Sequence, residues 1–387
     1  MKIYLMLSVV MFTAISGCSS TPEQTVKTDN ELLYIDNAFA QYQTFDVPTE
    51  EEIFALDESM KDFVTNSLIV EEDPNIRATL LLNKLFSRTT YNLQYRYGAN
   101  LTASQAFKQY EANCLSLTIL AYALAREANL QVRFQEILIP EYWVREGGYN
   151  MLTRHVNLKV IGDSKTPYRV LVGQKETIID FDPYTTKKHF RKKIIARDRV
   201  VAMFYNNIGA QALANGQYDE AYAYFKASLL KDDEYSAAWS NLGYLYKSVG
   251  LDKVAEQAYL SAVNYNHNNF NAWSNLEILV KSQGRIEESD SIKKFLYSHR
   301  VRNPYYHALL GEEAYFNGNY KQSIKHYNKA KRIEPEEHEF YFGLSRSFYM
   351  LGEYDKAESN LAKAQNKANF KDIKEKYRSK LNLLSKL

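Results

Sequence analysis

Five glycines, each 34 residues after the one before, set the pattern of the second half of this 387-residue chain. They are Gly216, Gly250, Gly284, Gly318 and Gly352. A 34-residue period is typical of a solenoid in which every repeat is a pair of helices joined by a short turn. One such pair cannot bury its apolar face alone, so the period predicts a stacked array of helix pairs.

Other residue types keep the register of these glycines. Ala221, Ala255 and Ala357 each stand five residues after their glycine. Aromatic residues stand near the start of four repeats, at Tyr205, Trp239, Trp273 and Tyr341. With these positions, residues 202–371 resemble five tetratricopeptide repeats. The resemblance implies an all-α solenoid that recruits protein substrates or partners on its concave face.

The third repeat departs from this pattern. Glu277, Ser289 and Lys293 replace the usual glycine, small and aromatic residues, so we expect its two helices to pack loosely. After the last repeat, residues 372–387 predict a capping helix with one apolar face. That face consists of Ile373, Tyr377, Leu381 and Leu384.

A different composition precedes the repeats. Residues 31–185 begin with the apolar spacing of helices and then change to the alternation of short strands, which predicts an α+β domain. The expected helices span residues 56–68, 78–97 and 113–128, and the expected strands span residues 132–134, 156–160, 168–172 and 177–182. Residues 186–201 contain seven Lys or Arg residues, and we expect them to form a solvated basic linker.

The first residues have the features of a signal peptide. Lys2 precedes an apolar run over residues 3–15, which is too short to span a bilayer. The run leads into Ser16-Gly17-Cys18. This ending resembles a lipobox, which implies cleavage of residues 1–17 and a lipid on Cys18. An ordinary signal peptide or a short anchor is the alternative interpretation.

Residues 18–30 are polar and predict a flexible tether. Ser19 resembles the sorting pattern for lipoproteins of the Gram-negative outer membrane. We therefore expect a protein that is anchored in the cell envelope by the lipid on Cys18 and faces the periplasm.

Cys114 is the other of the two cysteines in the chain. Asn113 is a good N-cap, which predicts Cys114 at the start of a buried helix. A helix N-terminus offers backbone N–H groups and partial positive charge, which stabilise a thiolate and the oxyanion that forms when a carbonyl is attacked. A lone cysteine is otherwise most often a small core hydrophobe.

A base and two acids follow on predicted strands. His155 begins one strand, and Asp180 and Asp182 share one face of the next. If the two strands are neighbours, an acid can reach the imidazole. Taken separately, a histidine beside a strand is usually a hydrogen-bonded structural residue, and acids before a proline commonly form turns.

Three segments together resemble the motifs of bacterial transglutaminase-like cysteine peptidases, which have a papain-like fold. The segments are Asn113-Cys114 with its helix, Arg154-His155-Val156-Asn157 and Ile179-Asp180-Phe181-Asp182-Pro183, within residues 80–185. The resemblance implies Cys114 as the nucleophile, His155 as the general base and Asp180 as its orienting acid, with Asp182 as the alternate. Gln109 is a candidate side-chain donor to the oxyanion.

Composition argues against several other kinds of site. The formal net charge is +2, so no strong global field favours nucleic acid. The seven histidines do not cluster at metal-ligand spacing, and no glycine-rich phosphate loop follows a strand. We expect neither a metal nor a cofactor. Tyr142, Trp143 and Tyr149 either line an acyl-substrate groove or pack within a loop.

Two functions remain. The first is a membrane-anchored, thiol-dependent acyl-transfer enzyme, a peptidase, amidase or transglutaminase, that acts on peptide or protein amides which the repeats recruit. The second is a non-catalytic lipoprotein scaffold for protein–protein interaction in envelope assembly.

Overall fold

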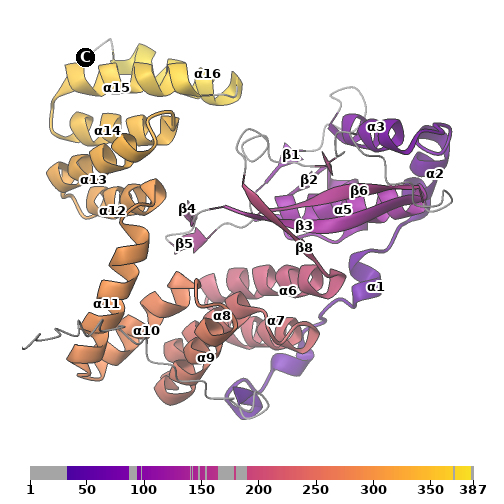
Figure 1. Ribbon diagram of the computed structural model, residues 1–387, viewed down its shortest axis with the longest axis horizontal. Helices are drawn as coiled ribbons and strands as arrows, with labels where there is room; N and C mark the ends of the chain where they lie inside the picture. Colours follow the sequence, from indigo (N-terminus) through magenta and orange to yellow (C-terminus); the bar gives the residue numbers. More distant parts are fainter. Residues whose placement is uncertain are drawn as a thin grey trace, which may run out of the picture.

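A computed structural model describes residues 33–86, 94–96, 98–139, 141, 143–146, 149–152, 155–163, 178–179, 190–368 and 371–384. Figure 1 shows an α+β part and a long helical array that curves around one side of it. The expected signal peptide and tether lie outside the described residues. Within these ranges, no helix combines the length and the apolar character needed to cross a membrane.

The α+β part is built on a four-stranded antiparallel sheet with the order β7-β6-β3-β8. Its strands are β3 (Leu130–Leu138), β6 (His155–Asp163), β7 (Ile178–Ile179) and β8 (Arg191–Ile195). One face packs against α5 (Cys114–Glu127), a helix that is buried on nearly all sides. The register pairs Phe134 with Leu158 and Leu158 with Ile179, which aligns the apolar side chains of one face toward α5.

Shorter elements surround this core. The helices are α1 (Glu50–Ile53), α2 (Glu58–Ser67), α3 (Pro74–Phe86) and α4 (Ala103–Gln109). Two small strand pairs are β1 (Gln94–Tyr95) with β2 (Glu111–Ala112) and β4 (Trp143–Glu146) with β5 (Tyr149–Leu152).

The helix expected over residues 78–97 differs from the one observed. It begins earlier because the Asp73 carboxylate accepts hydrogen bonds from the backbone N–H groups of Asn75 and Ile76, and Pro74 suits the first helical turn. It ends at Phe86, and residues 94–95 form β1.

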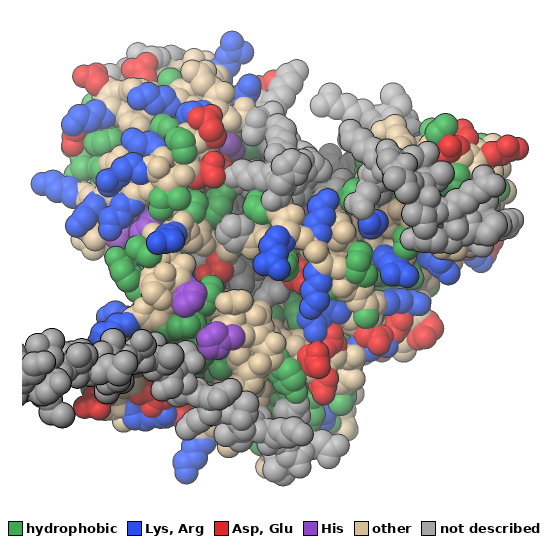
Figure 2. Space-filling model, in the orientation of Figure 1, with side chains coloured by type: hydrophobic (Ala, Val, Ile, Leu, Met, Phe, Trp, Pro, Cys, Tyr) green, Lys and Arg blue, Asp and Glu red, His purple; other side chains and the backbone are tan. Residues whose placement is uncertain are grey.

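The basic segment over residues 186–201 is not a solvated linker throughout. Residues 191–195 form β8 at the edge of the sheet, where Phe134 pairs with Ile195, and α6 begins at Arg197. Figure 2 shows Lys and Arg side chains gathered over β3 and β8. Exposed charges such as Lys192 protect an edge strand against pairing with another chain, which explains how a charge run serves as a strand.

Ten helices form the array as five antiparallel pairs within the described residues. They are α6 (Arg197–Ala214), α7 (Tyr218–Lys231), α8 (Ser236–Ser248), α9 (Asp252–Tyr265), α10 (Phe270–Ser282), α11 (Ile286–Arg300), α12 (Pro304–Phe316), α13 (Tyr320–Ile333), α14 (His338–Met350) and α15 (Tyr354–Lys367). The 34-residue glycines sit in the turns within the pairs. Gly250, for example, has a φ of +80°, which an L side chain rarely adopts.

A second set of glycines brings the paired helices together. A Cβ built on Gly243 in α8 would lie 2.7 Å from the ring of Tyr259 in α9. In the third repeat a polar contact takes this place, because the Ser289 hydroxyl donates to the Glu277 carboxylate over 2.7 Å. Ser289 is buried, so this pair is held by a hydrogen bond where the first, second and fourth repeats pack a glycine against an aromatic ring.

The last helix, α16 (Lys371–Leu384), closes the array. Tyr377 is buried in a cluster with Tyr341 and Leu361, and the other predicted apolar residues of α16 pack against that cluster. They are Ile373, Leu381 and Leu384.

Residues 33–49 do not belong with the α+β part, to which the sequence assigns them. They cross the first two repeats, where Leu33 and Phe39 are buried in one core with Tyr222 and Trp239. The Tyr246 hydroxyl donates to the Leu33 carbonyl over 2.5 Å. The segment packs on the array because it covers apolar side chains that the first two repeats would otherwise expose to water.

Candidate functional site

Cys114 is the first residue of α5, as its N-cap predicts. The Asn113 side chain accepts a hydrogen bond from the backbone N–H of Ser116 over 2.9 Å and donates to Asn100 over 2.6 Å. Cys114 is partly exposed, and it forms no disulfide within the described residues. The helix end is therefore rigidly held, with the thiol at its positive end.

His155 is the first residue of β6 and is paired with Ile137 at the end of β3. Its side chain is buried, with 3% of its surface exposed. Val156, the next residue of β6, packs in the core beside α5.

Thr118 joins the two elements. Its hydroxyl lies 2.8 Å from the Cys114 carbonyl oxygen, one turn back in α5, and 2.9 Å from the Val156 carbonyl oxygen. A hydroxyl has one proton, so the two carbonyls share it. The turn that carries Cys114 and the strand end that carries His155 are thus held at the same edge of the domain.

The two candidate acids, Asp180 and Asp182, lie outside the described residues. β7 ends just before them, and its pairing of Ile178 with Lys159 and of Ile179 with Leu158 makes it run toward the His155 end of β6. β6 and β7 are therefore neighbours, which is the condition that an acid on the second strand requires.

The described residues among the remaining candidates lie on α4 and on the β4–β5 hairpin. Gln109 is exposed at the end of α4, before the left-handed residue Tyr110. Trp143 and Tyr149 lie in the β4–β5 hairpin, where they pair with Leu152 and Glu146, and Tyr142 lies outside the described residues. No group of three His, Cys, Asp or Glu side chains that could hold a metal ion occurs in the part of the chain that the structure describes.

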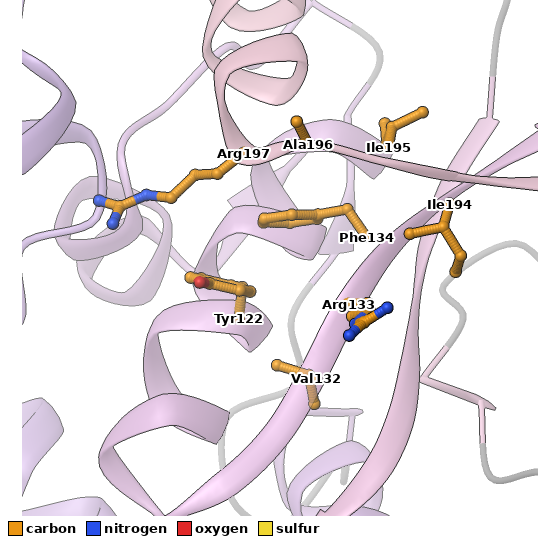
Figure 3. A pocket seen from close by; sticks show the side chains of 8 residues that line it. All are labelled: Tyr122, Val132, Arg133, Phe134, Ile194, Ile195, Ala196 and Arg197. Carbon is orange, nitrogen blue, oxygen red and sulfur yellow. The ribbon is translucent and has the colours of Figure 1, made fainter.

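A pocket lies farther along the sheet, between α5, β3, β8 and the start of α6 (Figure 3). Its walls include Tyr122, Val132 and Phe134, and Arg197 borders it. Arg197 is already engaged, since its guanidinium lies 2.8 Å from Glu50 and 4.4 Å from the centre of the Phe54 ring. The pocket is a seam between the domain and the array, two turns of α5 beyond Cys114.

A second polar site joins the domain to the array and was not found from the sequence. Glu141, between β3 and β4, receives two hydrogen bonds from the Arg300 guanidinium, over 2.7 and 2.9 Å. The Asn303 side chain donates to the Glu141 backbone carbonyl over 2.9 Å. Only 9% of the Arg300 side chain and 13% of the Glu141 side chain are exposed, so the pair is largely shielded from water.

Comparisons with known proteins concern the helical part. A tetratricopeptide repeat model matches residues 309–369. The uncharacterised protein ycf37 of Guillardia theta is 30% identical over 92 residues, which are 24% of this chain and 50% of that protein. The chain thus spans about half the length of the curated relative that it matches.

The chain carries tetratricopeptide repeats. The matched residues begin in α12 and include all of α15. Helix pairs with the same 34-residue spacing precede them, back to α6. The all-α solenoid expected from the sequence is therefore confirmed.

Solved structures of tetratricopeptide repeat proteins are also similar to this part. The MamA protein is 20% identical, with 43% of this chain and 91% of that chain covered and a TM-score of 0.26. TTC0263 of Thermus thermophilus is 20% identical, with 46% and 97% covered and a TM-score of 0.30. YrrB, described as a TPR protein with an unusual peptide-binding site, is 13% identical, with 46% and 92% covered and a TM-score of 0.26.

Equivalent positions on the first helices of the second to fifth repeats form a row that we call the inner stripe: Tyr244, Ile278, Glu312 and Arg346. Ser274 in α10 faces inward, because it contacts the guanidinium that holds Glu141. Ile278 follows one helical turn later on the same face and is 54% exposed. The equivalent residue of the second repeat is Tyr244, which is 40% exposed, and those of the next two repeats are Glu312 and Arg346, which form an ion pair.

Proposed function

We propose that this protein is a binding platform for other proteins and that its partners dock on the inner face of the tetratricopeptide array. The observation that carries the proposal is the exposed apolar pair Tyr244 and Ile278 at equivalent positions of neighbouring repeats. A curved array offers an extended concave surface, and exposed aromatic and aliphatic side chains on such a surface are suited to anchor a partner.

Substitution on the two faces tests this proposal. The double variant Tyr244→Asp, Ile278→Asp places charges on the inner stripe, while Leu230→Asp places one at a 70% exposed position on α7, outside the stripe. Reversible cross-linking in cells should yield protein adducts with the wild type and with Leu230→Asp, and at least tenfold fewer with the double variant. Equal adducts from all three proteins would remove the inner face from the proposal.

The envelope location forms part of the same proposal. A lipid on Cys18, after removal of residues 1–17, tethers the platform to a membrane, most simply the outer membrane facing the periplasm. Growth with a labelled fatty acid should mark the wild type, and Cys18→Ala should release an unmarked protein from the membrane fraction. An unmarked, released wild type would contradict the tether.

A second candidate function is thiol-dependent acyl transfer, and the Thr118 bridge between the Cys114 turn and β6 favours it. In this reaction the Cys114 thiolate attacks an amide carbonyl, and the C–N bond breaks as His155 donates a proton to the leaving amine. Water or another amine then attacks the thioester and restores the thiol. Asp180, or alternatively Asp182, orients the imidazole, and the array brings the peptide or protein substrate.

A thiol-directed acylating probe distinguishes the two functions. An active site should label Cys114 near neutral pH, and His155→Ala should abolish the labelling while Cys114→Ala serves as the blank. If His155→Ala labels as fast as the wild type, the imidazole does not assist the thiol, and the platform acts without acyl transfer.

A further inference from the structure

The Arg300 site has the properties of a preformed receptor for a carboxylate. Ser274 accepts a hydrogen bond from the Arg300 guanidinium over 2.7 Å, and the rings of Phe270 and Tyr306 lie 5.9 and 5.7 Å from its central carbon. All of these contacts come from the array itself. The guanidinium is therefore positioned whether or not Glu141 is present, which lowers the entropy lost when an anion binds.

Glu141 shows what the site recognises. The planar guanidinium takes both oxygens of one carboxylate, and Asn303 takes the main-chain carbonyl of the same residue. The first contact selects an acidic side chain, and the second accepts any extended peptide. Together, the Arg300 and Asn303 contacts recognise one acidic residue within a linear peptide segment.

We infer that the Arg300 site is a docking site for an acidic linear segment of a partner protein and that Glu141 occupies it in cis. The inference rests on the proposed platform function and names the chemistry of the partner. The site adjoins the inner stripe, since Ser274 precedes Ile278 by one helical turn. A partner that lies along the stripe can therefore place an acidic residue on Arg300 only by displacing Glu141.

Displacement of Glu141 would release the chain segment that leads to His155 in the candidate thiol site. Glu141 lies between Leu138, the last residue of β3, and the β4–β5 hairpin that leads to His155. The contact between Glu141 and Arg300 therefore fixes the connection between β3 and β6. The two ends of this connection, Ile137 and His155, are paired in the sheet.

The test uses the full chain and a labelled synthetic peptide with the sequence of residues 138–143, Leu-Ile-Pro-Glu-Tyr-Trp. Fluorescence anisotropy should show at least tenfold tighter binding to Glu141→Ala than to the wild type, because the intramolecular competitor is removed. Glu141→Gln, which retains the shape of the side chain, should also bind more tightly than the wild type. A peptide with Gln in place of Glu should lose at least tenfold on every protein.

Arginine variants supply the matched controls. Adding Arg300→Lys to Glu141→Ala should weaken binding at least fivefold, because Lys cannot form the two-pronged contact. Adding Arg285→Lys to Glu141→Ala should not weaken peptide binding, because Arg285 is paired with Glu256 and Glu288 elsewhere on the array. The inference would be overturned if the peptide bound equally to the wild type and to both Glu141 variants. It would also be overturned if the Gln peptide bound as tightly as the Glu peptide. Cross-linking that still depends on Tyr244 and Ile278 would then leave the platform proposal intact.

Discussion

The ring of Phe39 stacks on the ring of Tyr222, with their centres 4.4 Å apart and their planes 13° from parallel. The two residues are 183 positions apart in the sequence and belong to the N-terminal segment and to α7. Around them, the Tyr222 hydroxyl and the Lys226 ammonium both bind the Asp36 carboxylate. The N-terminal segment is therefore a cap on the first two repeats, and a lipid tether would pull on the array rather than on the α+β part.

Removal of the Phe39 ring tests the cap. Phe39→Ala should lower the free energy of unfolding by about 3 to 5 kcal/mol, because it leaves a cavity beside Tyr222. Phe316→Ala, at a ring that is 54% exposed, should change it by less than about 0.5 kcal/mol. Denaturant titration followed by tryptophan fluorescence, to which Trp239 beside Tyr34 contributes, measures both. Equal effects of the two substitutions would mean that the segment is not docked.

Close helix approach in the second repeat gives another prediction. Gly243→Ala forces a methyl group toward the Tyr259 ring and should cost about 1 to 3 kcal/mol. Lys253→Ala, at an exposed position of the same repeat, should cost less than about 0.5 kcal/mol. The shift in denaturation midpoint is the measurement, and an unchanged midpoint for Gly243→Ala would contradict the packing described.

The polar contact of the third repeat can be tested separately. Ser289→Ala removes the hydroxyl that donates to Glu277 and should destabilise the protein by about 1 to 3 kcal/mol, since a partly buried carboxylate loses its donor. The double variant Ser289→Ala, Glu277→Ala should recover part of this loss. A double variant that is less stable by the sum of the two single losses would show that the residues act independently.

Two histidines in the fourth repeat predict a dependence of stability on pH. Burial, together with the nearby Lys329 ammonium, lowers the pKa of His307 and of His326 below the ordinary value of 6.5. The unfolded chain therefore binds protons that the folded chain does not, and stability should fall as pH decreases from 7 through 6.5 toward 5.

Substitution of one of these histidines checks the origin of the effect. His326→Gln should flatten the fall in unfolding free energy between pH 7 and pH 5. Equal slopes for the wild type and His326→Gln would assign the pH dependence to other groups.

The sequence predicts those features that depend on local periodicity. The 34-residue spacing indicates the helix pairs because it repeats along the chain, and Asn113 indicates where α5 begins because a cap acts within one helical turn. Phe39 with Tyr222 and Glu141 with Arg300 could not be predicted in this way. Each contact joins residues more than 150 positions apart, and neither segment has a pattern that names its partner.

The charge run at residues 191–195 shows a different limit. Lys and Arg predict solvent exposure, and the residues are largely exposed, but exposure does not exclude an edge strand. For the candidate thiol site, Thr118 connects the elements that carry Cys114 and His155. The acids at positions 180 and 182 lie outside the described residues, so the assignment of the third member stays a prediction.

Photo-cross-linking from the inner stripe tests the binding platform most directly. A photoreactive amino acid placed at position 278 in the intact cell should yield a discrete protein adduct, while the same group at position 230 should yield none above background. The adduct at position 278 should also disappear when Tyr244→Asp is added. Adducts that are equally abundant from both positions, or that survive this substitution, would show that the inner face of the repeats is not where partners bind.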